Sequence, residues 1–214
     1  MATYPPIPEP SHNWPSRGGA MTEEAYHELE RLSPDRKYEY IDGMAHMMSG
    51  GSVAHDRITY NIRFALDGPL RAGPCAAFGV DVQVLIGIKK SGKRHLFYPD
   101  ATVSCDIGDG APDNTLIESP RVVVEVLSPS TEAKDRGAKF KAYQQCPTIQ
   151  EIVLVSQFAP YVEVWQRDEL DETRWHYRHY GPNEIVELRS ITVQIEMSAI
   201  YRGLNFAEPD EEDA

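Results

Sequence analysis

The stretch Arg121-Val-Val-Val-Glu-Val-Leu127 decides the fold of this chain. Four valines and a leucine surround a single carboxylate, Glu125. A short, β-branched and nearly continuous apolar run is typical of a strand that is covered on both faces. An ionised carboxylate inside such a strand is strongly penalised unless a cation, a hydrogen-bond donor or a proton compensates it. Glu125 therefore requires a partner, and that partner largely decides the function.

The sequence on either side of this strand predicts helices and further strands. The expected elements, in chain order, are a helix over 22–32, a hairpin over 37–48 that turns at Asp42-Gly43, a helix over 53–70, strands over 80–88 and 96–105, a polar loop over 106–118, the strand over 121–127, a helix over 132–145, strands near 150–156, 161–167 and 174–180, and a short final strand. This order favours an α/β (α+β) fold with a mixed central β-sheet flanked by helices, and argues against a regular doubly wound fold.

Length and composition predict one domain. The chain has 214 residues, of which 41% are hydrophobic, which is enough for a sizeable core. We expect a flexible proline-rich arm over 1–20, a single domain over 21–203 and a flexible acidic tail over 204–214. No run approaches 18 consecutive apolar residues, so no membrane span is expected.

Charge and cysteine content bound the possible partners and the compartment. The net charge of −12 argues against non-specific affinity for nucleic acid, so any nucleic-acid function has to rest on a local site. Cys75, Cys105 and Cys146 are odd in number and far apart, and they match neither a disulfide framework nor a zinc spacing. We therefore expect free thiols and a cytoplasmic location, the more so because the N-terminus lacks an apolar signal core.

Asp100 is the first candidate partner of Glu125. It lies on the polar face of the preceding strand, together with Thr102 and Ser104, because side chains alternate between the two faces. If the two strands pair, Asp100 and Glu125 can stand side by side. Adjacent carboxylates repel each other unless they share a proton or hold a divalent cation between them. Ligands that offer oxygen alone suit Mg²⁺ or Mn²⁺ better than zinc.

The helix after the Glu125 strand offers a cation. Asp135, Lys139 and Tyr143 share one helical stripe, and the helix has to pack back on the sheet because only a short turn precedes it. Lys139 could then point at the two carboxylates. An ordinary alternative is an exposed ion pair between Lys139 and Asp135, worth about 0.3–0.5 kcal/mol.

The motifs Tyr98-Pro-Asp100, Val-Val-Glu125-Val-Leu-Ser-Pro-Ser-Thr and Asp135-Arg-Gly-Ala-Lys139-Phe-Lys-Ala-Tyr143 together resemble the Uma-two type of endonucleases. That family belongs to the PD-(D/E)XK, or restriction-endonuclease-like, superfamily. The resemblance covers roughly 21–203, and the combined spacing is specific. It implies a restriction-endonuclease-like core with a divalent-metal site.

Carried over residue by residue, the resemblance implies a set of roles. Asp100 and Glu125, with the main-chain carbonyl of Val126, would bind Mg²⁺ or Mn²⁺, and Glu39 is a candidate third ligand. Lys139 would be the catalytic lysine. The remaining candidates are substrate contacts, namely His55 and Tyr143.

The chain departs from the superfamily pattern at one position. The usual lysine would follow the acid by two residues, where this chain has Leu127. The family is thought to move that lysine to the following helix, which Lys139 would satisfy.

Two weaker candidates come from position alone. Asp81 could be another acid of the site, and the basic turn Lys89, Lys90, Lys93 and Arg94 could contact a DNA backbone, although a solvated turn is the ordinary reading.

These observations predict a Mg²⁺-dependent endonuclease that hydrolyses phosphodiester bonds in DNA. The rival hypothesis is a catalytically silent module that binds nucleic acid or associates with itself, in which the carboxylates and Lys139 form a closed ion-pair cluster. A weaker third reading is a metal-dependent phosphoesterase for a small nucleotide. We also expect a homodimer, because the many strand edges need covering and the late strands carry Tyr161, Trp165, Trp175 and Tyr177.

Overall fold

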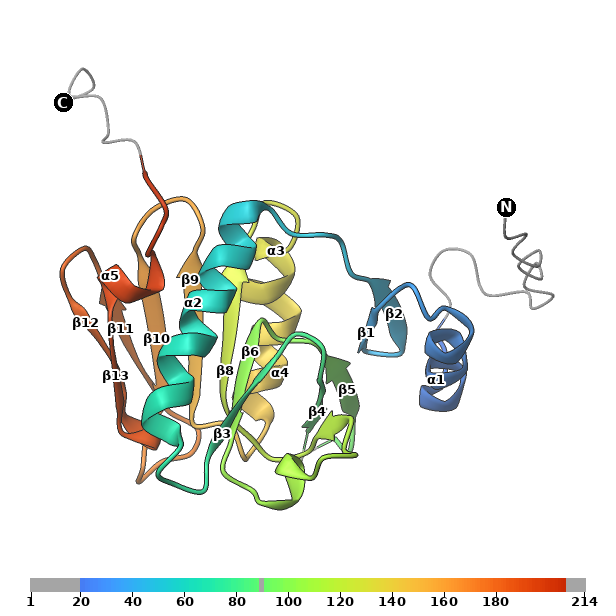
Figure 1. Cartoon of the computed structure of the whole chain (residues 1–214). Coiled ribbons are helices and arrows are strands. Elements are labelled where there is room, and N and C mark those ends of the chain that lie inside the picture. The colour runs from blue at the N-terminus through green and yellow to red at the C-terminus, as the bar shows by residue number, and fades with distance from the viewer. Residues whose placement is uncertain (1–19, 89–90, 207–214) are drawn as a thin grey trace, which may run out of the picture.

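The computed structural model describes residues 20–88 and 91–206, and Figure 1 shows the course of the chain. Within these residues no helix is long and apolar enough to cross a membrane. The helices and turns are α1 (Glu23–Leu32), α2 (Val53–Leu70), η1 (Gly108–Gly110), α3 (Glu132–Lys134), the π-helical turn η2 (Asp135–Lys139), α4 (Phe140–Gln145), η3 (Arg189–Ile191) and α5 (Met197–Ile200). The strands are β1 (Tyr38–Ile41), β2 (Met44–Met47), β3 (Ala76–Gly79), β4 (Gln83–Gly87), β5 (Arg94–Phe97), β6 (Ala101–Ser104), β7 (Leu116–Ile117), β8 (Pro120–Leu127), β9 (Glu151–Ser156), β10 (Val162–Arg167), β11 (Trp175–Tyr180), β12 (Ile185–Leu188) and β13 (Val193–Glu196).

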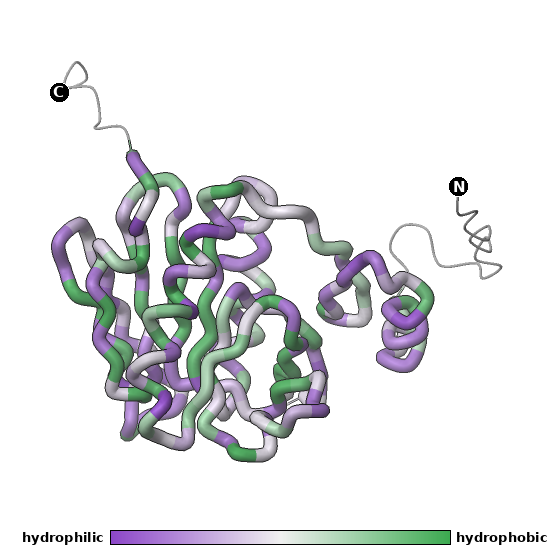
Figure 2. The backbone as a smooth tube through the Cα atoms, in the orientation of Figure 1, coloured by the Kyte–Doolittle hydropathy of each residue, from purple (hydrophilic) through white to green (hydrophobic). Residues whose placement is uncertain are grey.

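The strand that contains Glu125 lies in the middle of a six-stranded sheet. The strand order is β11-β10-β9-β8-β6-β3, in which β8 and β9 run parallel and the other neighbours pair antiparallel. The valines of β8 alternate between two hydrophobic cores, as expected for a strand covered on both faces, and Figure 2 shows this strand as strongly hydrophobic. The mixed α/β architecture with helices beside a mixed sheet confirms the predicted fold class.

Each face of this sheet is covered by different elements. On one face α2 packs its apolar side, with Ile58, Ile62 and Leu66, against Val124 and Val126. On the other face α4 and part of a second sheet pack against Val123 and Leu127. The helix α2 therefore lies across one side of the central strands and the α3–α4 segment across the other, as Figure 1 shows.

The second sheet has five strands in the order β2-β1-β5-β4-β7, and a two-stranded sheet joins β12 to β13. The β1–β2 hairpin of the five-stranded sheet turns at Asp42 and Gly43, which have φ angles of 48° and 82°. Two consecutive positive φ angles are typical of a type I′ hairpin, and Asp-Gly is a preferred pair for it. The predicted turn is thus present, and it holds Glu39 of β1 in a fixed position beside the main sheet.

The predicted strand over 96–105 is in fact two strands in different sheets. β5 belongs to the five-stranded sheet and β6 to the six-stranded sheet, and the chain crosses between them at Tyr98-Pro99-Asp100. Pro99 has no N–H for a strand ladder, so it is suited to a point where one sheet ends. The crossing leaves Asp100 at the start of β6.

The expectation of free thiols is wrong for two of the three cysteines. Cys75 and Cys105 form a disulfide, and Cys146 is free and buried. The reason lies in β3, which sequence reasoning missed because its residues, Ala76 to Gly79, are mostly small. β3 pairs with β6 in a register that sets Ala76 opposite Ser104, and one step further that register sets Cys75 opposite Cys105. The argument from cysteine content for a reducing compartment therefore loses its basis.

Candidate functional site

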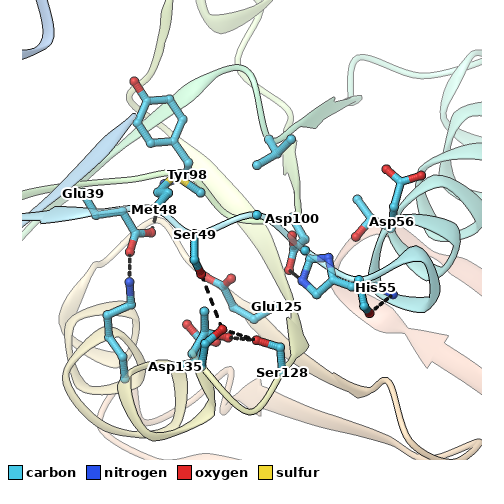
Figure 3. Close-up of a pocket in the computed structure, with 18 of the residues that line it drawn as sticks. Glu39, Met48, Ser49, His55, Asp56, Tyr98, Asp100, Glu125, Ser128 and Asp135 are labelled. Carbon is cyan, nitrogen blue, oxygen red and sulfur yellow. Dashed lines mark hydrogen bonds and ion pairs between the residues drawn. The ribbon is translucent and has the colours of Figure 1, made fainter. Parts of the chain in front are cut away.

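A pocket of about 510 Å³ opens where the end of β8 meets the N-terminal end of α2, the β1–β2 hairpin and the α3–η2 segment. Figure 3 shows acidic side chains from several of these elements converging on it. Its charged lining residues are Glu39, His55, Asp56, Asp100, Glu125, Lys134, Asp135 and Lys139.

Asp100 and Glu125 are brought together by strand pairing. β6 and β8 are antiparallel with Ala101 opposite Val124, so the same register carries Asp100 to a position opposite Glu125. The N–H of Val126 donates to Oδ2 of Asp100 at 2.7 Å, which fixes that carboxylate against the end of β8. Both acids are buried.

Lys139 is the buried cation of the site. Its Nζ lies 2.7 Å from Oε1 of Glu125, 2.8 Å from Oε1 of Glu39 and 3.5 Å from Oδ1 of Asp135. The side chain is 3% exposed, so an exposed pair with Asp135 alone is not what the structure contains. Lys139 instead joins three carboxylates that come from β1, β8 and its own helix.

Glu39 is held by two lysines. Its Oε1 accepts from Lys139 and its Oε2 accepts from Lys134 at 2.6 Å. Burial acts to raise the pKa of Glu39, but the two ammonium groups outweigh it and hold the pKa below its ordinary value. Both oxygens of Glu39 are thus engaged by amines, which makes it an anchor for Lys139 in the structure; the predicted role as a metal ligand remains a prediction.

The pi-helical turn explains how Lys134 and Lys139 reach the same carboxylate. Residues five apart in an α-helix point about 140° away from each other, because each residue turns the helix by about 100°. The wider π-helical turn over Asp135–Lys139 reduces this angle, so Lys134 and Lys139 point toward more nearly the same side of the helix. Lys134 was therefore missed by helical periodicity, and no signal in a regular 3.6-residue pattern would have found it.

Tyr143 lies beneath the site. Its hydroxyl donates to Oε1 of Glu125, and its ring packs edge-on against Phe97. Burial first, and then the neighbouring Glu125, raises the pKa of Tyr143 well above its ordinary value, so the hydroxyl keeps its proton. The side chain is fully buried, and its hydroxyl group helps to hold the Glu125 carboxylate in position.

His55 stands at the first turn of α2 and faces Asp100. Ser52 caps the helix, with its Oγ accepting from the N–H of His55 at 3.1 Å. Nε2 of His55 lies 3.3 Å from Oδ2 of Asp100. The contact with Asp100 raises the pKa of His55 against the opposing effect of burial, and the nearby backbone carbonyl of Val126 adds to the rise. His55 and the Val126 carbonyl thus both border Asp100, as Figure 3 shows for the imidazole.

The burial of several acids also changes the proton affinity of Glu125. Desolvation raises the pKa of Glu125 well above its ordinary value; Lys139 opposes this, and Asp135, Asp100 and Glu39 add to it. For Lys139, burial favours the neutral amine, but Glu125 and the other acids outweigh it and keep the pKa high. The amine therefore stays charged, while Glu125 readily accepts a proton when no other cation is near.

The donor set suits a hard divalent cation. Both protein contacts of Glu125 use Oε1, and those of Asp100 use Oδ2, so Oε2 and Oδ1 have no hydrogen-bond donor in the described part of the chain. The four buried carboxylates at the pocket outnumber the two lysines by two negative charges. No three His, Cys, Asp or Glu side chains among residues 20–88 and 91–206 are arranged to hold a metal ion. Two carboxylates and a main-chain carbonyl remain compatible with Mg²⁺, which usually retains several waters.

Comparison with known proteins identifies the family. A family model described as "Uma2: Putative restriction endonuclease" matches residues 23–199.

The chain belongs to the Uma2 family.

Relatives of this Uma2 chain include two proteins from Synechocystis sp. (strain ATCC 27184 / PCC 6803 / Kazusa). Uncharacterized protein slr1290 is 35% identical over 170 residues, which is 79% of this chain and 86% of that protein. Uncharacterized protein sll1609 is 29% identical over 167 residues, which is 76% of this chain and 84% of that protein.

A solved structure supports the same fold. The crystal structure described as that of "a putative nuclease belonging to DUF820" from Anabaena variabilis ATCC 29413 superposes with a TM-score of 0.62, at 14% identity, over 78% of this chain and 90% of that chain. At this identity the match shows the fold alone and carries no residue roles.

Two other predicted groups of the Uma2 chain lie apart from the pocket. Asp81 is exposed and pairs with Lys37. In the basic turn, Lys93 pairs with Asp42 at 2.7 Å and Arg94 with Glu23 at 3.1 Å, so both cations are already neutralised. Lys89 and Lys90 lie outside the described residues.

Proposed function

We propose that this protein is a metal-dependent endonuclease that hydrolyses phosphodiester bonds in DNA. The observation that carries the proposal is the meeting of Asp100, Glu125 and the buried Lys139 at one open pocket, in a chain of the Uma2 family. Acids that can bind a divalent ion, with an adjacent amine that can donate to the phosphate, can together promote phosphodiester hydrolysis.

In this proposal Asp100, Glu125 and the Val126 carbonyl hold Mg²⁺ or Mn²⁺. A bound divalent ion supplies charge neutralisation at the phosphate and lowers the pKa of a water. The oxygens that have no donor in the described residues, Oδ1 of Asp100 and Oε2 of Glu125, support this assignment. The excess of negative charge at the pocket supports it as well, because it would otherwise be neutralised by protons.

Lys139 would act as a positively charged ammonium group. Its ammonium group can donate to the phosphate oxygens as negative charge develops on them, and Glu39 and Asp135 keep it in place. Glu39 is then a positioning residue that acts through Lys139. His55, beside Asp100 at the pocket, would orient the acid and donate a hydrogen bond to the substrate phosphate; its contact with Asp100 supports the first of these roles.

The silent module remains the second candidate, because one observation favours it. Lys139 is contacted by three carboxylates, which is what a closed ion-pair cluster would look like. Such a cluster binds no metal and cleaves no nucleic acid. The two candidates therefore differ in a direct measurement.

Asp100→Asn and Glu125→Gln, each compared with the wild-type protein, test the proposal. The wild-type protein should bind Mn²⁺ in titration calorimetry and nick supercoiled plasmid with Mg²⁺ or Mn²⁺ but not with EDTA. Both variants should lose metal binding and cleavage but keep the wild-type circular dichroism spectrum. Asp100→Ala and Glu125→Ala should behave in the same way in all three measurements. Asp81→Asn, which removes an exposed acid outside the pocket, is the matched control and should remain active. Full cleavage by either folded site variant would refute the assignment.

Dimer formation and a cytoplasmic location stay predictions. The outer strand of the six-stranded sheet, β11, has an unpaired edge among the described residues, which supports self-association. Sedimentation of the purified protein measures it directly.

A further inference from the structure

The solvent side of α2 carries an unusual row of side chains. Val53, Arg57, Tyr60 and Phe64 follow one another at spacings of four, three and four residues, so they form one line along the helix. The opposite side, with Ile58 and Ile62, is buried in the core. We call the four exposed residues the α2 stripe.

Two aromatic rings of the stripe are exposed and aligned. Tyr60 is 55% and Phe64 61% exposed. Their ring centroids are 6.3 Å apart and their planes differ by 19°, so the faces of both rings are similarly oriented. The outward face of a surface helix is normally polar. Adjacent exposed aromatic side chains on such a face are typical of a binding surface.

Two arginines that have no acidic partner within the described residues lie near these rings. The guanidinium group of Arg202 lies 5.6 Å from the centre of the Phe64 ring. Arg57 and Arg202 form no ion pair with any residue in 20–88 or 91–206. The same holds for Arg36, Arg63, Arg121 and Arg167, whereas other arginines are paired, such as Arg71 with Asp67 and Arg136 with Glu163. In a chain with a net charge of −12, free guanidinium groups beside exposed rings fit a ligand that has both phosphates and flat apolar rings.

The stripe is continuous with the proposed active site. Val53, its first residue, lines the pocket together with His55 and Asp56 of the same helical turn. Phe64 lies about 16 Å further along the helix. In Figure 1, α2 runs across the front of the sheet, and Figure 3 shows His55 of its first turn beside Asp100.

We propose that the α2 stripe binds a single-stranded segment of the nucleic acid whose phosphodiester bond is cleaved in the pocket. Bases would stack on Tyr60 and Phe64, and phosphates would bind Arg57 and Arg202. This inference rests on the proposed endonuclease function and adds the strandedness of the substrate near the cut. The faces of bases are available for stacking in a single strand, and a regular duplex hides them.

A second aromatic group serves as the control. Trp165, Tyr177 and His179 on β10 and β11 lie close together, with the Trp165 and Tyr177 ring centres 4.8 Å apart. Arg136, which lies near this group, is neutralised by Glu163. This group therefore offers rings without free cations, and we expect no nucleic-acid contact there.

The test measures binding of labelled DNA to the full chain in EDTA, where no cleavage occurs. The probes are a single strand of about 20 nucleotides, longer than the ~4–16 nucleotides that one binding module covers, and the matching duplex. Tyr60→Ala and Phe64→Ala should each weaken single-strand binding by about 5- to 150-fold, with a smaller effect on duplex. Arg57→Gln should reduce the slope of log affinity against log salt by about 0.7. Tyr177→Ala is the matched control for the rings, and Arg174→Gln, which removes an exposed arginine paired with Asp171, is the matched control for the cations. Both should bind as the wild-type protein does.

Each outcome supports or overturns the inference. The inference would be overturned if Tyr60→Ala and Phe64→Ala lost the same affinity for single-stranded and duplex DNA. It would also be overturned if they lost no more affinity than the control variants. A change of oligomeric state in Tyr60→Ala with unchanged DNA affinity would mean that the stripe contacts a second copy of the chain, which also overturns it.

A small substrate separates this inference from the proposed function. Bis(p-nitrophenyl) phosphate has a single phosphodiester and cannot reach the stripe from the pocket. If Tyr60→Ala loses DNA binding but hydrolyses this ester normally, both ideas stand. If the wild-type protein hydrolyses the ester and cuts DNA but the stripe variants bind DNA normally, the inference alone fails. If the wild-type protein hydrolyses neither substrate, the proposed function fails.

Discussion

Replacing Lys139 by methionine removes the buried charge of the site and keeps most of its volume. The ammonium group lies 2.7 Å from Glu125 and 2.8 Å from Glu39, and the side chain is 3% exposed. Removing one partner of a buried ion pair costs roughly 3–5 kcal/mol of stability. Losing a donor that stabilises charge in a transition state lowers turnover by about 10²–10³-fold. We therefore expect Lys139→Met to fold with a lower Tm and to lose nearly all cleavage.

Lys134→Met is the matched control. Lys134 contacts the same Glu39 at 2.6 Å, but it is 26% exposed and does not reach Glu125. The Lys134 side chain is partly exposed and is one of two amines on Glu39, so we expect its removal to cost less stability than the removal of Lys139. Glu39 would still be held by Lys139. We expect this variant to stay within a few-fold of wild-type turnover.

Plasmid nicking under single-turnover conditions, well below the Tm of each variant, compares the two lysines directly. Thermal denaturation of the same samples separates loss of folding from loss of chemistry. If unfolding limits Lys139→Met, the addition of Asp135→Asn removes a buried acid that has lost its ion-pair partner Lys139, and it should recover stability but not activity. Near wild-type cleavage by folded Lys139→Met would refute the role of this amine, and equal losses in both variants would show that the lysines act by stability alone.

Two further predictions concern stability. In the metal-free protein the raised pKa of Glu125 means that the folded state retains a proton that the unfolded chain releases, so stability falls as the pH rises above the ordinary value of 4.5. Glu125→Gln should therefore gain Tm relative to the wild-type protein between about pH 5 and 8, as fluorescence melting at several pH values can show, and parallel profiles would contradict this. The Cys75–Cys105 disulfide closes a segment with a sequence separation of 30 and should contribute about 3–4 kcal/mol. Replacing both cysteines by serine should lower the Tm and remove its sensitivity to reductant; an unchanged Tm would show that the bond is not formed in solution.

Much of the central sheet could be predicted from local patterns. The run of valines around Glu125 indicated a strand covered on both faces, and β8 is such a strand. The apolar spacing over 53–70 predicted α2 with the observed bounds. These predictions succeed because the period of apolar residues depends on which face of an element is buried.

The predicted convergence of Asp100 and Glu125 also depended on pairing between neighbouring strands. The alternation of side chains shows which face each acid occupies, and the register of β6 on β8 then sets them opposite each other. The approach of Lys139 followed from the short connection between β8 and the next helix. Their roles in catalysis remain for the experiments above.

Sequence alone determined the buried strand with its single carboxylate, most of the helices and strands around it, and the residue types available to bind a hard cation. Tertiary structure decided that Glu39 of a separate sheet is the anchor of Lys139, that a π-helical turn brings Lys134 to the same carboxylate, and that Cys75 lies against Cys105. The physical reason is how far apart in the chain the interacting residues lie. Local periodicity reports which side of an element is buried, whereas contacts between elements far apart in the chain depend on sheet order, register and helix geometry that no short stretch of sequence contains.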